Sequence, residues 1–307
     1  MLTEKKLEER RTGIGGSDAA AVCGLSRFKT PYKLYLEKIG EVDTSSFHEG
    51  NEKIHFGNLL EDIIASEYSR RTGNKVEILE DTIRHKDYPW MLANVDRIIK
   101  NNNGILECKT SDAYLSKLWG ESYTDDFPIE YLLQCAHYAI VFDAAFVDLA
   151  VLIGGNNFKI YTYKRNPNLE SKLIEKEKSF WNNHVIPQVA PDPITSEEAS
   201  LVWSETIGEY KTANQELKEK LQELVGIKKE IDELSQKKDN LELLIKSELK
   251  EKDGLADEYG NVLLTWKNQQ SRKFDIKSFQ KTNPSLYEEF LKVSNSRVFR
   301  IRSLNDE

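Results

Sequence analysis

Two short apolar segments, Met91–Ile99 and Ile105–Thr110, flank the sequence Lys-Asn-Asn-Asn-Gly, which is typical of a turn between antiparallel strands. The first segment carries Asp96, and the second carries Glu107 and Lys109. Because side chains alternate between the faces of a strand, Glu107 and Lys109 share one face, and either register of the hairpin places Asp96 on that face. Two carboxylates and an amine on a largely apolar sheet face are costly unless they are paired or bind a metal.

This charged cluster suits Mg²⁺, which prefers oxygen ligands, keeps several waters and is typically held by one or two carboxylates. Such an ion can activate water and stabilise the departing oxygen in phosphodiester hydrolysis. Lys109 can orient the water or offset charge on the phosphate. The alternative is a surface hairpin with a salt bridge between its strands, because this spacing of two acids and a lysine often arises by chance.

Two predicted helices bring further polar side chains towards packing faces. Glu61 lies one turn before apolar residues of a helix predicted over about residues 54–71, so its carboxylate can join the cluster directly or through water. On a second helix, predicted over 129–142, Gln134 and Tyr138 share one face, and a buried glutamine needs a hydrogen-bond partner. An ordinary surface glutamate and ordinary core packing are the alternative interpretations.

A glycine-rich segment, Thr12–Asp18, precedes the apolar run Ala19–Cys23, and Ser17 or Asp18 can cap a helix over that run. A glycine-rich turn that opens a helix offers free N–H groups and the positive end of the helix dipole, which suits a phosphate. A plain helix-start turn explains the same residues equally well.

The order of predicted elements indicates an α/β (α+β) chain, and 307 residues allow about two domains. Residues 1–190 mix helices with short strands. Residues 195–253 form a charged helical segment, whose irregular apolar spacing indicates a helical hairpin or an imperfect coiled coil. Residues 254–307 form a small α+β appendage.

The C-terminal appendage is basic and rich in aromatic residues. Between Trp266 and Arg302 there are nine Lys or Arg and three acids, and six aromatic residues are interleaved with them. This composition is typical of a surface for nucleic acid or for an acidic partner. In the alternative interpretation, the aromatic residues form a small core of their own. The charged helix before it could mediate oligomerisation or dock a partner.

Composition excludes several classes of protein. No window approaches the roughly 18 consecutive apolar residues of a membrane-spanning helix, and the charged N-terminus resembles no secretion signal. The three cysteines (Cys23, Cys108 and Cys135) are too few and too scattered for a disulfide scaffold or a four-cysteine iron–sulfur cluster, so we expect a cytoplasmic protein without such a cluster. The net charge of −8 does not exclude a nucleic-acid enzyme, because the local charge distribution decides that.

The ordered set of motifs resembles the YqaJ-type viral recombinases, relatives of the phage lambda exonuclease in the PD-(D/E)xK nuclease superfamily. The resemblance covers about residues 8–165. The segments that carry it are Arg10–Ala20, Gly24–Ser26, Thr30–Pro31, Gly57–Glu61, Asn94–Asp96, Glu107–Lys109 and Gln134–Tyr138. It implies a restriction-endonuclease-like core, in which helices flank a central mixed sheet.

The resemblance also implies the roles of the clustered residues. Asp96 and Glu107, with the backbone carbonyl of Cys108, would bind Mg²⁺, for which Mn²⁺ is a plausible substitute. Glu61 would complete the acidic cluster, and Lys109 would act on the nucleophilic water. The residues that it marks as catalytic are Glu61, Asp96, Glu107, Lys109, Gln134 and Tyr138.

In the lambda relative, an arginine and a serine near the N-terminus bind the 5′-terminal phosphate. The serine matches Ser17. The arginine matches Arg10 if the segment is ungapped and Arg11 if one residue slips, so both are candidates. Arg27 and Lys29 are further candidates for contacts with the DNA backbone, although solvated loop cations are the alternative interpretation.

The function implied by the resemblance is 5′→3′ resection of linear double-stranded DNA by a Mg²⁺-dependent exonuclease, which leaves 3′ single strands for recombination. The resemblance further implies a ring-shaped homo-oligomer, often a trimer, a single-strand annealing protein as partner, and a phage or prophage origin in a bacterial host cell. Two alternatives are an endonuclease of the same fold and a non-catalytic DNA-binding or scaffold protein.

Overall fold

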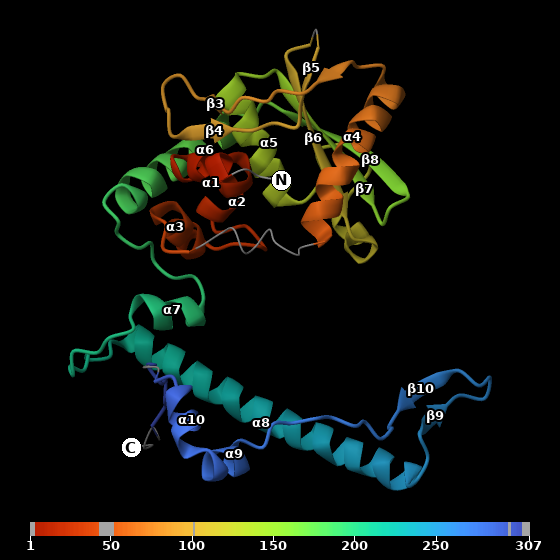
Figure 1. The fold of residues 1–307 in the computed structure, drawn as a ribbon, viewed down its shortest axis with the longest axis vertical. Helices are drawn as coiled ribbons and strands as arrows, with labels where there is room; N and C mark the ends of the chain where they lie inside the picture. The colour runs from red at the N-terminus through yellow and green to blue at the C-terminus, as the bar shows by residue number, and fades with distance from the viewer. Residues whose placement is uncertain (1–3, 43–51, 101, 294–295, 303–307) are drawn as a thin grey trace. The chain divides into compact units, whose positions relative to one another are not determined.

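The computed structural model describes four stretches of the chain, residues 4–42, 52–100, 102–293 and 296–302. The chain divides after Ser204 into two units (Figure 1). The first unit extends beyond the boundary expected at residue 190 because helix α7 (Ser196–Val202) belongs to it. Glu198 of α7 is buried and accepts hydrogen bonds from the Thr30 hydroxyl and the Ile194 N–H. Within these four stretches no helix has both the length and the apolar character needed to cross a membrane.

A five-stranded mixed sheet forms the centre of the first unit, with the strand order β2-β5-β6-β7-β8. β6 and β7 run parallel, whereas the other neighbouring strands run antiparallel. The five strands are β2 (Val76–Glu77), β5 (Arg97–Ile99), β6 (Gly104–Ser111), β7 (Phe146–Ile153) and β8 (Asn157–Lys164). A smaller sheet has the order β1-β4-β3 and consists of β1 (Ile14–Gly15), β4 (Met91–Ala93) and β3 (Ile83–Arg84).

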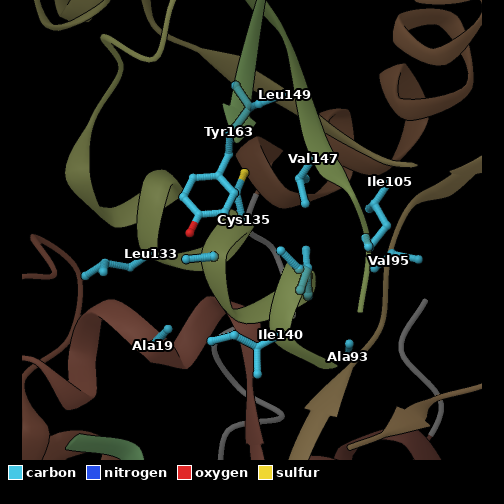
Figure 2. Close-up of a cluster of buried hydrophobic side chains, with 14 of the residues drawn as sticks. Ala19, Ala93, Val95, Ile105, Leu133, Cys135, Ile140, Val147, Leu149 and Tyr163 are labelled. Atoms are coloured by element: carbon cyan, nitrogen blue, oxygen red, sulfur yellow. The ribbon is translucent and has the colours of Figure 1, made fainter. Parts of the chain in front are cut away.

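Helices cover both faces of the five-stranded sheet. α4 (Glu52–Thr72) packs on one face, and α5 (Ile129–Phe142) packs on the other. Because side chains alternate along β6, Leu106 belongs to the buried cluster of α4, whereas Ile105 belongs to that of α5. Figure 2 shows the α5 cluster, to which Val147 of β7 also contributes. The same alternation turns Glu107 and Lys109 towards α5.

The remaining helices of the first unit flank this core. The sequence defines both ends of α3 (Pro31–Ile39). Thr30 caps it by accepting a hydrogen bond from the Lys33 N–H, and Gly40 ends it in the left-handed conformation (φ 83°). The other helical elements are α1 (Glu4–Arg11), a 3₁₀ turn (Gly16–Asp18), α2 (Ala19–Val22), a 3₁₀ helix (Ala113–Leu118) and α6 (Pro167–Phe180), which a π-helical turn (Trp181–Val185) follows.

The segment Met91–Ile99 does not form the single strand that its apolar pattern predicts. Met91–Ala93 pairs in the smaller sheet, and Arg97–Ile99 pairs in the five-stranded sheet. The chain crosses between the sheets at Asn94–Asp96, where two residues that disfavour strands flank the buried Val95. This crossing releases Asp96 from both sheets.

The second unit contains α8 (Gln215–Leu249), one continuous helix of 35 residues. Of the two predicted forms, the helical hairpin is therefore wrong, and the imperfect coiled coil stays a prediction. The Asn214 side chain caps it by accepting from the Leu217 N–H at 2.9 Å. Its single interior glycine, Gly226, costs too little to break a helix that is otherwise composed of good helix formers. A hairpin and two short helices complete this unit: β9 (Gly254–Ala256), β10 (Val262–Thr265), α9 (Ile276–Thr282) and α10 (Pro284–Glu289).

Candidate active site

The β5–β6 hairpin sets the position of the Asp96 carboxylate. Arg97 lies opposite Leu106 in the register of this hairpin, so Asp96 comes level with Glu107 at the end of the paired region. Oδ2 of Asp96 accepts a hydrogen bond from the backbone N–H of Cys108 at 2.7 Å. The acid released at the sheet crossing is thereby tied to the strand that carries the second acid.

The two oxygens of Glu107 have different surroundings. Oε1 accepts hydrogen bonds from Nε2 of Gln134, at 2.6 Å, and from the Lys109 ammonium. Oε2 is buried and has no hydrogen-bond partner among the described residues. Since Glu107 is only 2% exposed, the surface hairpin with a simple salt bridge is excluded. A buried carboxylate oxygen without a donor is costly, which indicates that a cation belongs beside it.

Helix α5 supports this arrangement from the other side. Nε2 of Gln134 also donates to the Tyr138 hydroxyl at 3.0 Å, and that hydroxyl donates to the carbonyl oxygen of Asn94 at 2.9 Å. One chain of hydrogen bonds therefore runs from Glu107 through α5 to the crossing that precedes Asp96. Gln134 is thus buried against the Glu107 carboxylate, whereas the Tyr138 ring also belongs to the buried hydrophobic cluster, so core packing explains part of this helix face.

The charges of the cluster perturb one another. Burial and the neighbouring Glu107 carboxylate raise the pKa of Asp96 to about 7. Burial alone would lower the pKa of Lys109, but the carboxylates of Glu107 and Asp96 raise it above its ordinary value, so Lys109 is a cation at neutral pH. The carboxylates of Asp96 and Glu107 are so close that one of them is difficult to ionise. A divalent cation bound to both would stabilise their negative charges.

Glu61 lies on α4 near this pair, and a basic residue holds its carboxylate. Nη1 of Arg97 donates to Oε1 of Glu61 at 2.6 Å, and the same guanidinium contacts the Asp62 carboxylate and the Asp96 carbonyl. Burial and Asp96 raise the pKa of Glu61. Across the described stretches, no three His, Cys, Asp or Glu side chains converge closely enough to hold a metal. Glu61 as a ligand, like the Cys108 carbonyl, therefore stays a prediction.

Arg97 is a residue of this site that the sequence patterns missed. It is 5% exposed and bridges the α4 acids to the Asp96 backbone. The position of Arg97 within an otherwise apolar strand segment could have indicated its role, because a buried guanidinium requires acidic partners.

The candidate phosphate-binding residues near the N-terminus do not all lie together. Nη2 of Arg10 donates to Oγ of Ser17 at 3.2 Å, so these two side chains lie together. The guanidinium of Arg11 lies beside Gly40 instead. The contacts thus favour Arg10 as the arginine that would share a phosphate with Ser17.

Arg27 and Lys29 are paired with acids in the first unit. The Arg27 guanidinium contacts the Glu130 carboxylate of α5, and the Lys29 ammonium contacts the Glu37 carboxylate and lies 3.7 Å from Oδ1 of Asp18. Neither is the freely solvated loop cation of the alternative interpretation.

The sequence patterns also missed a buried ion pair, between Lys38 and Asp18, that lies at the glycine-rich turn. Nζ of Lys38 donates to Oδ2 of Asp18 and to the carbonyl oxygen of Arg10, both at 2.7 Å. Asp18 also accepts a hydrogen bond from the Gly15 N–H at 3.2 Å, and its side chain makes no capping hydrogen bond to α2. The prediction that Asp18 caps this helix is therefore wrong. Burial alone would raise the pKa of Asp18, but Lys38 and the nearby cations lower it below its ordinary range.

This turn precedes a helix of only four residues, α2, whose dipole is small. The prediction that a helix dipole attracts the phosphate therefore loses its physical basis. Side chains rather than the helix end would carry that role.

Comparison with known proteins identifies the family. Residues 7–145 match the YqaJ-like viral recombinase domain. The chain is also 36% identical to the uncharacterized protein YqaJ of Bacillus subtilis (strain 168) over 315 residues, which covers 99% of this chain and 96% of that protein. This chain belongs to the YqaJ-like viral recombinase family.

Among solved structures, the YqaJ-like chain resembles an alkaline exonuclease (LHK-Exo) from Laribacter hongkongensis, with a TM-score of 0.50 and 16% identity. The match covers 61% of this chain and 94% of that one, and LHK-Exo in complex with dAMP matches equally well. The predicted family is thus confirmed, and so is the predicted fold class, an α/β core in which helices flank a central mixed sheet, with a fold like that of an exonuclease. The roles of individual site residues stay predictions.

Proposed function

We propose that this YqaJ-like protein is a divalent-metal-dependent deoxyribonuclease that resects linear double-stranded DNA in the 5′→3′ direction and leaves 3′ single strands. One observation carries the proposal: Glu107 Oε2 is buried with no hydrogen-bond partner in the described part of the chain, near the second acid, Asp96, and the cation Lys109. The exonuclease-like fold of the first unit supports the same reaction class.

The carboxylates of Asp96 and Glu107, with the Cys108 carbonyl, would hold Mg²⁺ or Mn²⁺, and Glu61 would complete the acidic set. When bound there, such an ion supplies activation of water and neutralisation of charge on the phosphate. Glu107 Oε1 is already occupied by Gln134 and Lys109, so Oε2 is the oxygen left for the cation.

The other side chains orient the reacting groups. The Lys109 ammonium, held beside Glu107, donates a hydrogen bond to the attacking water or to a phosphate oxygen. Gln134 fixes the rotamer of Glu107, and Tyr138 extends this support to the Asn94 carbonyl and hence to Asp96. Such supporting contacts commonly change metal affinity or activity by about 10–100-fold.

The end of the DNA would be recognised in the N-terminal turn. Arg10 and Ser17 lie within hydrogen-bond distance of each other and would share a terminal 5′ phosphate. Arg11 stays a weaker candidate, and Arg27 and Lys29 would contact the DNA backbone after exchanging an acidic partner for a phosphate. The complex of LHK-Exo with dAMP supports a nucleotide-containing substrate for this fold.

Cleavage of three substrates in Mg²⁺ tests the function: linear duplex with a 5′ phosphate, linear duplex with a 5′ hydroxyl, and closed circular plasmid. We expect nucleotide release from the phosphorylated end, a slower reaction at the hydroxyl end, no attack on the plasmid, and no activity in EDTA. Glu107→Gln should lower the rate by more than about 100-fold, whereas Glu175→Gln, on the exposed face of α6, should not.

Nicking of the plasmid without regard to the 5′ phosphate would establish an endonuclease. Metal-independent binding without cleavage would establish a scaffold protein.

Family resemblance further supports a ring-shaped homo-oligomer, a trimer, that encircles DNA, and an annealing protein that receives the 3′ strand. Light scattering on the full chain with and without duplex DNA tests the ring. A monomer mass in both conditions would refute it.

A further inference from the structure

The aromatic residues of the basic C-terminal segment, Trp266–Arg302, do not form a core. Phe274, Phe290 and Phe299 are 70%, 74% and 77% exposed, and Trp266 is 44% exposed. Within residues 205–293 and 296–302, which the structure describes, Leu249 is the one buried side chain, and it lies on α8 outside this segment. The alternative interpretation, in which these aromatics pack into a small core of their own, is therefore contradicted.

The segment combines these exposed rings with positive charge. Its nine Lys or Arg outnumber its three acids. One of the acids, Asp275, is occupied within the chain, because it caps α9 by accepting from the Ser278 N–H at 3.0 Å and from the Ser278 hydroxyl at 2.7 Å. Phe274 and Phe279 lie with their ring centroids 5.0 Å apart at the start of the same helix, beside Lys273 and Lys277 in the sequence.

We propose that the described part of this segment, residues 266–293 and 296–302, is a binding surface for single-stranded DNA. Cations attract the phosphate backbone of any nucleic acid, but exposed aromatic faces gain energy only from bases that are free to stack on them. Bases in a duplex are already stacked, so the rings distinguish a single strand from a duplex. A partner that offers acidic groups alone would use the cations but gain nothing from the rings. The surface goes beyond the proposed nuclease function, because it lies in the second unit and requires neither metal nor cleavage.

The test measures binding by the full chain carrying Glu107→Gln, in EDTA, so that the result does not depend on cleavage. The probes are a fluorescent oligothymidylate and an abasic strand of the same length, which keeps the phosphates but lacks bases. The aromatic variant is Phe274→Ala/Phe290→Ala/Phe299→Ala. The charge variant is Lys273→Gln/Lys277→Gln/Arg300→Gln. Tyr210→Ala is the matched control, because this ring is 97% exposed in the same unit but lies outside the basic segment.

We expect the aromatic variant to bind oligothymidylate at least about 5-fold more weakly than the parent, the lower end of the contribution of one base–aromatic stack. Its affinity for the abasic strand should be unchanged. The charge variant should bind both strands more weakly and with a smaller salt dependence, by about 0.7 in the logarithmic slope for each lost phosphate contact. The Tyr210→Ala control should behave like the parent.

Unchanged oligothymidylate binding by the aromatic variant would overturn the proposal, and so would an equal loss on the abasic strand. Polyglutamate is the probe for an acidic protein partner. If the aromatic variant loses polyglutamate binding while it keeps oligothymidylate binding, the surface serves an acidic polypeptide and the proposal fails. Circular dichroism of each variant checks that the helices of the second unit are retained.

Discussion

Replacing Lys38 by methionine tests the network that holds the proposed phosphate turn. The Lys38 ammonium donates to the Asp18 carboxylate and to the Arg10 carbonyl, each at 2.7 Å. The side chains of Lys38 and Asp18 are 4% and 3% exposed. Methionine keeps an apolar stem of similar shape but removes the charge, so Asp18 is left as a buried carboxylate without its main cation.

Removing one partner of a buried ion pair typically costs about 3–5 kcal/mol of unfolding free energy, because the remaining charge is neither solvated nor paired. Lys29 lies 3.7 Å from Oδ1 of Asp18 and compensates in part, so we expect a loss of about 3 kcal/mol. A domain of ordinary stability, about 5–15 kcal/mol, still folds after such a loss.

Urea unfolding followed by tryptophan fluorescence measures this loss, and Lys33→Met on the exposed face of α3 is the control, with an expected change within about 0.5 kcal/mol. The pH dependence is a second readout. In the parent, the pKa of Asp18 lies below its ordinary value, so its stabilising contribution is present at neutral pH and is lost only in strong acid. In Lys38→Met, burial without the cation raises the pKa of Asp18, so protonation favours folding and the loss of unfolding free energy becomes smaller as the pH falls below neutral.

If Lys38→Met loses less than about 1 kcal/mol of unfolding free energy at neutral pH, or if this loss grows on acidification, the Lys38–Asp18 pair does not stabilise the fold as argued. The double variant Asp18→Asn/Lys38→Met removes both charges of this pair and should recover part of the stability. Because Lys38 also holds the Arg10 carbonyl, Lys38→Met should reduce the ratio of cleavage rates on 5′-phosphorylated and 5′-hydroxyl ends.

Three other perturbations probe the core of the site. Mg²⁺ should raise the thermal unfolding temperature of the parent but not of Glu107→Gln, and an equal shift in both would place the ion elsewhere. Gln134→Leu removes a donor to Glu107 Oε1 and should raise the Mg²⁺ concentration needed for half-maximal cleavage by about 10–100-fold; an unchanged Mg²⁺ dependence would contradict this role. Gly16→Ala places a methyl group 2.5 Å from the buried Tyr138 ring and should cost about 1–3 kcal/mol in urea unfolding. Gly57→Ala, where the nearest atom is 3.8 Å away, is its control, and equal stability of the two would refute the clash.

Local patterns in the sequence determined much of the first unit. The cap and stop residues of α3, Thr30 and Gly40, act within one turn of the chain, so the local sequence determines both ends of this helix. Alternation along β6 correctly placed Glu107 and Lys109 on one face, because the strand period is a property of the backbone. The order of the motifs was sufficient to recognise the family.

Only the tertiary structure decided which distant charges pair. It places Lys38 on Asp18, Arg97 on Glu61, and Arg10 rather than Arg11 beside Ser17. It also splits Met91–Ile99 between two sheets, which lets Asp96 approach Cys108. Apart from Arg10–Ser17, these contacts join residues at least 12 positions apart in the sequence. Their energy depends on burial, and burial depends on how the helices and sheets pack. A local pattern records the neighbours of a residue along the chain, whereas the partner of a buried charge is selected by packing.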